Sequence, residues 1–318
     1  MNTYEIIKKG WYFMLNRIIA LEGGDGVGKK TQTSNLITNL NLYFLQKETE
    51  TKHKESFPAV IRFQVPNYEN ESSILVRKFL AGDFPEGRGD SDVYAATLSY
   101  SLDRYLTFYS PIPEDAWEEF CDRYGIYTGN QINRQMKISY ADLFNHPSKY
   151  GFEGGIIIVA DRYIESNLMY QGARLIEKYA KSFEYYSKMG EEEYDRIVRA
   201  GVSHEYFLFF KEWLINLEKN LLHLPYGNDE GVHTIYLSLS EEIANRNMQS
   251  RYKGDSSKKD ILEKDEFLQK CVRIVAEREI DLGEMQSIKC YSGSLMYSKE
   301  KIADMIFEYV KKEILYEL

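Results

Sequence analysis

The stretch Ile18-Ile-Ala-Leu-Glu-Gly-Gly-Asp-Gly-Val-Gly-Lys-Lys-Thr-Gln32 decides how this chain begins to fold. An apolar run leads into a glycine-rich turn, and Gly23, Gly28 and Lys29 have the spacing of the phosphate-binding pattern G-x-x-x-x-G-K. Glycines allow several backbone N–H groups to point at one anion, and the positive end of the following helix dipole adds to the attraction. The stretch predicts three consecutive elements: a buried strand at 17–21, a phosphate-binding loop at 23–31 and a helix at 31–45.

The loop can be assigned residue by residue. Lys29 is expected to reach the outer phosphates of a nucleoside triphosphate. The alternative, a flexible glycine turn, is disfavoured because the turn stands between a strand pattern and a helix pattern. The predicted ATP-binding residues are Gly23, Asp25, Gly26, Gly28, Lys29, Lys30 and Thr31.

One position of the loop departs from the pattern. After Gly-Lys, the pattern has Ser or Thr, whose hydroxyl holds Mg²⁺, but this chain has Lys30. An ammonium group has three donors and no acceptor, so Lys30 cannot ligate a metal. Thr31 comes one residue late, so it is not expected to hold the metal in place of that hydroxyl. A Mg²⁺ ion at this loop is therefore expected to depend on phosphate oxygens, water and a carboxylate.

Composition excludes several classes of protein. The chain has 318 residues, of which 43% are hydrophobic and 28% charged, as in soluble globular proteins. Its net charge of −9 argues against non-specific binding to nucleic acid or to anionic membranes. No apolar stretch is long enough to span a bilayer, and residues 1–10 lack the apolar core of a signal peptide. The three scattered cysteines indicate a reducing cytoplasm and no metal-binding spacing: Cys121, Cys271 and Cys290.

Apolar runs and helical patterns alternate along the chain. The predicted strands are 17–21, 59–65, 155–160, 234–239 and 287–291. Further helices are predicted at 73–80, 92–109, 164–189, 205–222, 241–252, 265–282 and 298–318. This alternation predicts an α/β fold with three layers, α/β/α, around a five-stranded parallel sheet whose ligands bind at the carboxyl ends of the strands. The segments near 111–153 and 174–203 lack the alternation and are interpreted as insertions.

The third predicted strand runs directly into Asp161-Arg-Tyr-Ile-Glu-Ser-Asn-Leu-Met-Tyr-Gln-Gly-Ala173. The planar guanidinium of Arg162 suits two oxygens of an acceptor phosphate, with an ion pair to Asp161 or Glu165 as the alternative. Asp161 follows a buried strand, where a carboxylate can hold Mg²⁺ or its waters, with a helix cap as the alternative. This segment therefore adds a second anion site to the one predicted at the glycine loop.

Together with Glu-Gly-x-Asp-x-x-Gly-Lys-x-Thr-Gln in the first loop, this second motif resembles the signature of the thymidylate kinase family. Further matches are Pro66-Asn-Tyr68, Tyr100-Ser-Leu-Asp-Arg104, the stretch 246–251 and Asp260-Ile-Leu-Glu-Lys-Asp265. The resemblance extends from about Met14 to the C-terminus. It implies an N-terminal extension at 1–13, a single P-loop kinase domain at 14–318, a lid near 246–260 and a homodimer.

The resemblance implies transfer of the γ-phosphoryl group of ATP to a deoxynucleoside monophosphate, with dTMP expected first and Mg²⁺ as the metal. In the family, the residue matching Asp25 accepts a hydrogen bond from the sugar 3′-hydroxyl. Tyr100 would stack on the base and Arg104 would donate to it, although core packing is an alternative for Tyr100. The implied catalytic residues are Lys29, Asp161, Arg162, Arg246 and Arg251, with Asp161 also the candidate metal ligand. The implied substrate-binding residues are Asp25, Pro66, Tyr68, Arg77, Tyr100, Arg104, Arg162, Asn167, Tyr170 and Gln171.

Some positions depart from the family pattern and leave alternatives open. Tyr68 stands where many relatives have an Arg for the acceptor phosphate, so Arg77 or Lys30 would have to replace it. Asp103 stands where Asn is more usual, and Gly26 where some relatives carry a catalytic Arg. A deoxynucleoside kinase, which needs no acceptor-phosphate site, is one alternative function. A nucleotide-binding protein without catalysis is another, motivated by Lys30 and the insertions.

Overall fold

The computed structural model describes residues 15–51, 57–85, 89–114, 116–117, 120, 137–182, 190–253 and 260–315. The predicted extension at 1–13 lies outside these residues, as do positions 121–136 and 183–189 of the two predicted insertions and positions 254–259 of the predicted lid. Within the described residues, no helix combines the length and apolar character that crossing a membrane requires.

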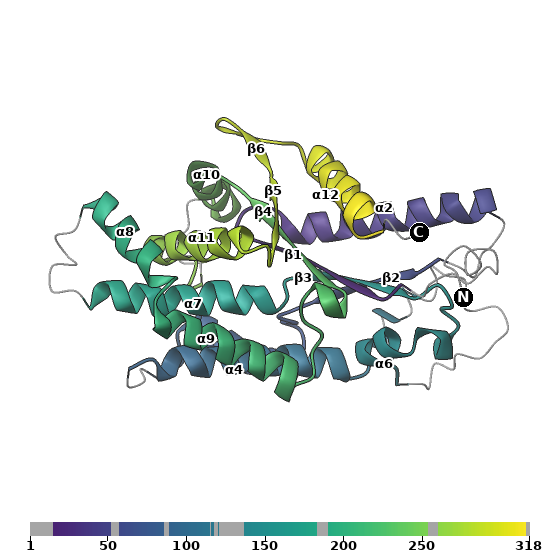
Figure 1. Cartoon of the computed structure of the whole chain (residues 1–318), viewed down its shortest axis with the longest axis horizontal. Helices are drawn as coiled ribbons and strands as arrows, with labels where there is room; N and C mark the ends of the chain where they lie inside the picture. Colours follow the sequence, from purple (N-terminus) through teal and green to yellow (C-terminus); the bar gives the residue numbers. More distant parts are fainter. Residues whose placement is uncertain are drawn as a thin grey trace, which may run out of the picture.

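The five predicted strands are present and form one parallel sheet (Figure 1). They are β1 (Arg17–Gly23), β2 (Ala59–Gln64), β3 (Ile156–Asp161), β4 (Val232–Ser238) and β5 (Gln286–Lys289), in the order β2-β3-β1-β4-β5. The central strand β1 lies between β3 and β4, with Leu21 opposite Asp161. This register brings the glycine loop after β1 and the Asp-Arg pair at the end of β3 to the same edge of the sheet. The chain has the α/β P-loop kinase fold.

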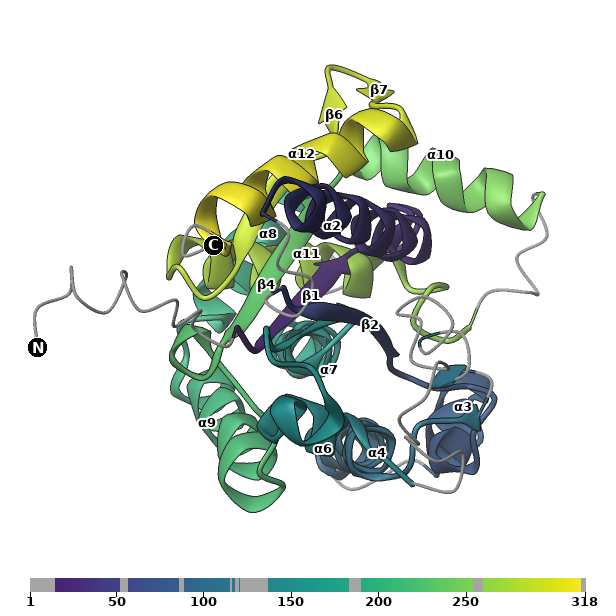
Figure 2. The ribbon, with the colours of Figure 1, turned by 90° about the vertical axis from the view of Figure 1, so that its right-hand side faces the viewer.

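Helices cover both faces of the sheet (Figures 1 and 2). On one face, α2 (Lys29–Thr51) packs beside α12 (Lys299–Glu313). On the other, α7 (Ile164–Lys181) is the central helix, with α4 (Ser91–Tyr109), α9 (Glu205–Ile215) and α11 (Glu266–Asp281) packed around it. The remaining helices are α3 (Ile74–Ala81), α6 (Tyr140–Asn145), α8 (Glu191–Gly201) and α10 (Glu241–Tyr252), and a short hairpin is formed by β6 (Tyr291–Ser292) and β7 (Leu295–Met296).

Alternation along β1 produces the two layers of the core. Ile19 and Leu21 pack toward α2 and α12, whereas Ile18 and Ala20 point toward the opposite layer. All four side chains are fully buried. A continuous apolar run in the sequence is thus what a parallel strand covered on both faces requires.

The helices predicted at 164–189 and 298–318 end earlier in the structure, at Lys181 and Glu313, and a third prediction differs in the kind of helix. The pattern at 205–222 predicts a single helix, but α9 ends at Ile215 and a π-helical segment, Asn216–Leu221, follows. This wider turn carries Glu218, which is fully buried and binds Ser101 and Arg104 of α4. Hydrophobic periodicity does not predict this π-helical turn, because the polar contact that accompanies it joins elements far apart in the sequence.

Candidate active site

The glycine loop connects β1 to α2 in a conformation that its glycines permit. Gly26 and Gly28 have left-handed φ values of 81° and 84°. A Cβ atom at Gly23 would lie 2.8 Å from the carbonyl oxygen of Leu237, so no side chain fits between the loop and β4. The prediction of a strand, a glycine loop and a helix is confirmed, with α2 beginning at Lys29, two residues earlier than predicted.

Lys29 folds back over the loop. Its Nζ donates to the carbonyl oxygens of Gly23 at 2.7 Å and Gly24 at 3.0 Å, and only 8% of the residue is exposed. Burial, together with the positive charge of Arg162, lowers the pKa of Lys29 to about 8. The ammonium group is therefore still mainly protonated at pH 7, and it is held at the mouth of the loop.

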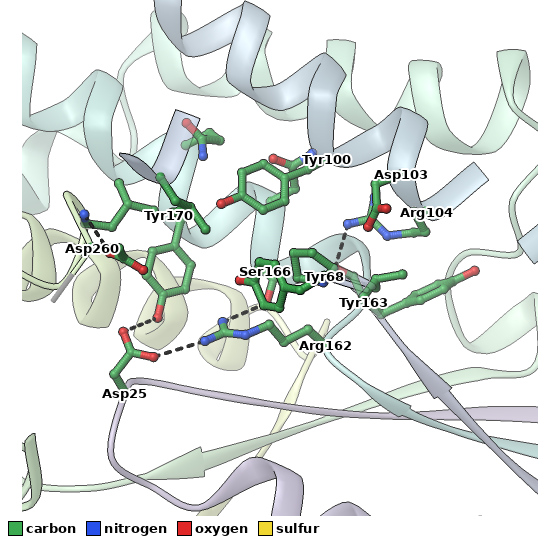
Figure 3. A pocket seen from close by; sticks show the side chains of 16 residues that line it. Asp25, Tyr68, Tyr100, Asp103, Arg104, Arg162, Tyr163, Ser166, Tyr170 and Asp260 are labelled. Atoms are coloured by element: carbon green, nitrogen blue, oxygen red, sulfur yellow. Dashed lines mark hydrogen bonds and ion pairs between the residues drawn. The ribbon is translucent and has the colours of Figure 1, made fainter. Parts of the chain in front are cut away.

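Arg162 and Asp25 form the centre of the site (Figure 3). Nη2 of Arg162 donates to Oδ1 of Asp25 at 3.0 Å, and the guanidinium lies over the ring of Tyr170, whose hydroxyl donates to Oδ2 of Asp25 at 3.1 Å. Burial alone would raise the pKa of Asp25, but Lys29 and Arg162 outweigh it and lower that pKa. Of the ion pairs considered for Arg162 from the sequence, neither Asp161 nor Glu165 is the partner; Asp25 takes that place.

Sequence reasoning missed Glu22, the fully buried last-but-one residue of β1. Its carboxylate accepts hydrogen bonds from the backbone N–H groups of Tyr163 (2.7 Å) and Ser166 (3.2 Å) and from the Ser166 hydroxyl (2.5 Å). These groups belong to the start of α7, whose first N–H groups have no partner within the helix. Glu22 thus fastens the end of β1 to the start of α7. The available signal was a carboxylate inside an apolar strand pattern.

Glu165 provides a test of burial at this joint. Burial, reinforced by the nearby charge of Glu22, raises the pKa of Glu165 from 4.5 to about 7. Between these two values the folded chain binds the proton and the unfolded chain does not, so the free energy of unfolding falls as pH rises. We expect the Glu165→Gln variant to reduce this slope by up to about 1.4 kcal/mol per pH unit in urea titrations.

The control for this titration is Glu308→Gln on α12, whose side chain is 64% exposed. It should leave the slope unchanged. Parallel stability profiles for the wild type and Glu165→Gln would show that Glu165 does not hold a proton in the folded state.

A pocket opens beside Arg162 (Figure 3). Nine of the ten substrate-binding residues predicted from the sequence line it, although they come from segments far apart in the chain. The exception is Arg77. The full lining is Asp25, Val65, Pro66, Tyr68, Leu80, Tyr100, Asp103, Arg104, Arg162, Tyr163, Ser166, Asn167, Tyr170, Gln171, Asp260 and Leu262.

Two of the predicted arginines have structural partners instead of a free guanidinium. Arg77 lies outside the pocket. It donates to the carbonyl oxygens of Tyr68 (2.6 Å) and Asn70 (2.9 Å) and so holds the loop that follows β2. Arg104 reaches the pocket but is buried, and it is paired with Glu218 and bonded to the carbonyl oxygen of Tyr163 at 2.9 Å. The positive charge of Arg104 is therefore already balanced by a carboxylate.

The amides of α7 offer an unused acceptor and an unused donor. Asn167 donates through Nδ2 to the carbonyl oxygen of Thr97 at 3.1 Å, whereas its buried Oδ1 has no partner among the described residues. Gln171 accepts through Oε1 from Arg174 at 2.7 Å, and its buried Nε2 likewise lacks a partner within the described part of the chain. Both residues line the pocket, and unpaired buried polar atoms of this kind favour a polar ligand.

Two more carboxylates line the pocket besides Asp25. Asp103 accepts from the Ser72 hydroxyl at 2.6 Å, and its burial raises its pKa. Asp260 accepts from backbone N–H groups of the turn that follows it, and burial raises its pKa to about 6. Sequence reasoning noted the stretch that contains Asp260 but gave that residue no role. The pocket therefore has an acidic wall.

A larger hollow lies over the glycine loop and shares several residues with the pocket, among them Asp25, Tyr68 and Arg162. Its lining includes Gly26, Gly28, Lys29, Lys30, Asp161, Asn247 and Arg251. The side chain of Arg251 is 59% exposed and lies 3.6 Å from a carboxylate oxygen of Glu263.

Three of the predicted ATP-binding and catalytic residues are not among those that line this hollow: Gly23, Thr31 and Arg246. Arg246 donates to the carbonyl oxygen of Ser294 in the β6–β7 hairpin at 3.0 Å, and Thr31 is exposed on α2. Neither of these two side chains lines the hollow or the pocket, whereas Gly23 offers its carbonyl oxygen to Lys29.

Comparison with known proteins gives likeness in structure only. No protein-family model matches the chain, and no curated protein matches it. A thymidylate kinase from Candida albicans is similar at 15% identity and a TM-score of 0.46, over 94% of this chain and 92% of that one. A thymidylate kinase from Ehrlichia chaffeensis is similar at 13% identity and a TM-score of 0.36, over 93% of this chain and 99% of that one. At these values, the function of the neighbours does not transfer to this chain.

Proposed function

We propose that this protein is an ATP-dependent kinase that phosphorylates a deoxynucleoside monophosphate, with dTMP as its preferred acceptor. The observation that carries the proposal is the contact between the hollow over the glycine loop and the pocket beside α7, which meet at Asp25 and Arg162. In-line phosphoryl transfer needs a donor phosphate and an acceptor oxygen facing each other with their charge neutralised. Two adjoining cavities, with Arg162 at their junction and Lys29 in the larger one, meet that need.

The pocket has groups suited to a pyrimidine base. Oδ1 of Asn167 can accept from a ring N–H, and Nε2 of Gln171 can donate to the neighbouring carbonyl, as thymine and uracil present them. Asn167 and Gln171 are four residues apart on α7, so both lie on one face of the helix. Tyr68 and Tyr100 supply aromatic rings at the same pocket. The proposal thus assigns the base to the α7 side and the phosphate to Arg162.

Positioning and charge are the chain's contribution to the transfer. Lys29 would neutralise the outer phosphates of ATP. Arg162 would bind the acceptor phosphate, either in place of its ion pair with Asp25 or in addition to it. Asp25 would then accept a hydrogen bond from the sugar hydroxyl. No covalent intermediate on the protein is needed.

The residues at the loop do not fit a metal ion held by the protein. Position 30 offers an ammonium group instead of a hydroxyl, and the Asp161 carboxylate has the Arg62 guanidinium 4.0 Å away. Among the described residues, no group of three or more His, Cys, Asp or Glu side chains is arranged to hold a metal. The roles given above to Lys29, Arg162 and Asp25 therefore do not depend on a Mg²⁺ ion held by the protein.

A second candidate function is phosphorylation of a deoxynucleoside. The observation that favours it is the acidic wall formed by Asp25, Asp103 and Asp260, because the two pocket arginines, Arg104 and Arg162, are each paired with a carboxylate. Tyr68 also brings no cation to the place where an acceptor phosphate would lie. An uncharged acceptor meets less repulsion in this pocket than a dianion does.

A panel of acceptors separates the two functions. ADP formation from ATP is measured with dTMP, dUMP, dCMP, dAMP, dGMP and the matching nucleosides at equal concentrations. We expect the highest kcat/KM with dTMP. Turnover with nucleosides alone would replace the first proposal by the second, and ATP binding without turnover on any acceptor would overturn both.

A further inference from the structure

Two cationic side chains, Lys30 and Arg62, lie near Asp161. Lys30 stands at the position where the phosphate-binding pattern has a hydroxyl that binds the metal. Lys30 lines the hollow over the loop together with Asp161. Arg62 projects from β2, and its Nη2 lies 4.0 Å from Oδ2 of Asp161. The carboxylate that would be needed to hold a metal or its waters is thus already facing a guanidinium.

Arg62 is held in this position from the first turns of α2. Its Nη1 donates to the hydroxyl of Ser34 at 3.2 Å, and its Nη2 donates to the carbonyl oxygen of Lys30 at 3.5 Å. The side chain is 34% exposed, whereas its Nε is buried and has no hydrogen-bond partner among the described residues. Because the backbone of Lys30 is one of these partners, the two cations lie at one end of the same helix.

A divalent cation and these two groups compete for the same place. A metal brought to Asp161 would meet the positive charges of Arg62 and Lys30, with one carboxylate to offset all of them. The triphosphate of ATP has the opposite relation to them, because ammonium and guanidinium groups donate strong hydrogen bonds to phosphate oxygens. The chemistry of the residues present therefore favours the nucleotide without its metal.

We infer that Lys30, which lines the hollow, neutralises the outer phosphates in place of a metal held by the protein, while Arg62 occupies Asp161, so that this chain binds ATP without requiring Mg²⁺. The inference rests on the proposed function only in taking the glycine loop as the triphosphate site. It makes no demand on the identity of the acceptor. Asp161 then acts to orient Arg62 and is not a metal ligand.

The test is calorimetric titration of the full chain with ATP, in EDTA and in excess Mg²⁺. We expect the Kd in EDTA to be no more than about threefold weaker than the Kd in Mg²⁺, a difference of under one kcal/mol. In the double variant Lys30→Thr, Arg62→Gln, the Kd in EDTA should rise at least about tenfold and Mg²⁺ should then tighten binding. Arg62→Lys retains the charge and should retain binding in EDTA.

The control is Lys312→Thr on α12, where the side chain is 81% exposed. It should bind ATP as the wild type does, and thermal unfolding of each variant checks that it is folded. Wild-type binding that appears only with Mg²⁺ would overturn the inference and leave the kinase proposal in place. Equal binding in EDTA by the wild type and the double variant would also overturn it, and absence of ATP binding under both conditions would remove the triphosphate site itself.

Discussion

Replacing Lys29 with alanine is expected to abolish phosphoryl transfer to every acceptor. Its ammonium group is the loop cation with the lowest exposure, and bonds to Gly23 and Gly24 hold it where the outer phosphates would lie. Loss of a preorganised charge of this kind should lower kcat/KM by about 10³-fold or more, corresponding to about 4 kcal/mol of transition-state stabilisation. Steady-state ADP formation across the acceptor panel measures it.

The matched control is Lys312→Ala, because that side chain is exposed and lies far from the loop in sequence. Its kinetics should equal those of the wild type. Circular dichroism of Lys29→Ala should show an intact fold, since its ammonium group contacts only nearby residues, namely the carbonyl oxygens of Gly23 and Gly24 and, at 4.0 Å, the carboxylate of Asp25. A Lys29→Ala variant that retained turnover would contradict the assignment of residues 23–31 as the phosphate loop.

Replacing Arg162 with alanine should lower kcat/KM for a nucleoside monophosphate by about 10³-fold. The guanidinium lies at the junction of the two cavities, and removing it leaves Lys29 as the remaining cation beside Asp25, so that the carboxylate repels an acceptor phosphate more strongly. Arg162→Lys should recover part of the activity, because an ammonium supplies charge without the planar fork. Initial rates at varied acceptor and saturating ATP separate kcat from KM.

Arg199→Ala serves as the control, because Arg199 lies on α8, pairs with Asp195 and Glu277, and lines neither the pocket nor the hollow. Its kinetics should be unchanged. Comparison of the two acceptor classes adds a second readout, since a nucleoside has no phosphate for Arg162 to bind. An equal loss for nucleosides and monophosphates would mean that Arg162 acts through Asp25 and not on the acceptor phosphate.

The sequence predicts the strands of this fold because each is a short apolar run, and a strand buried on both faces leaves that pattern. It does not predict their order in the sheet. The pairing of Leu21 with Asp161 joins residues 140 positions apart, and no local pattern encodes it. Gly23 shows the same limit. The sequence shows that a glycine stands there, but it does not show that the backbone of β4 lies against it and leaves no room for a side chain.

Residues that the sequence places on one helix face do lie together in the structure. Asn167 and Gln171 share one face of α7, and both line the pocket. The partners of long charged side chains were not predicted, because they come from distant elements. Arg104 is neutralised by Glu218, which is 114 positions away, and Arg246 bonds to a hairpin 48 positions away. Proximity in the fold decides what such a side chain binds.

Glu22 has a mechanical consequence for turnover. It fastens the strand that carries the donor loop to the helix that carries the acceptor pocket, through three hydrogen bonds within one buried carboxylate. These two parts should therefore behave as one stiff body, with little compliance at their joint. The opposite wall, formed by Asn247 and Arg251 of α10, has no comparable buried anchor to α7 among the described contacts. We expect any closing motion over a bound nucleotide to come from α10, while β1 and α7 stay fixed relative to each other.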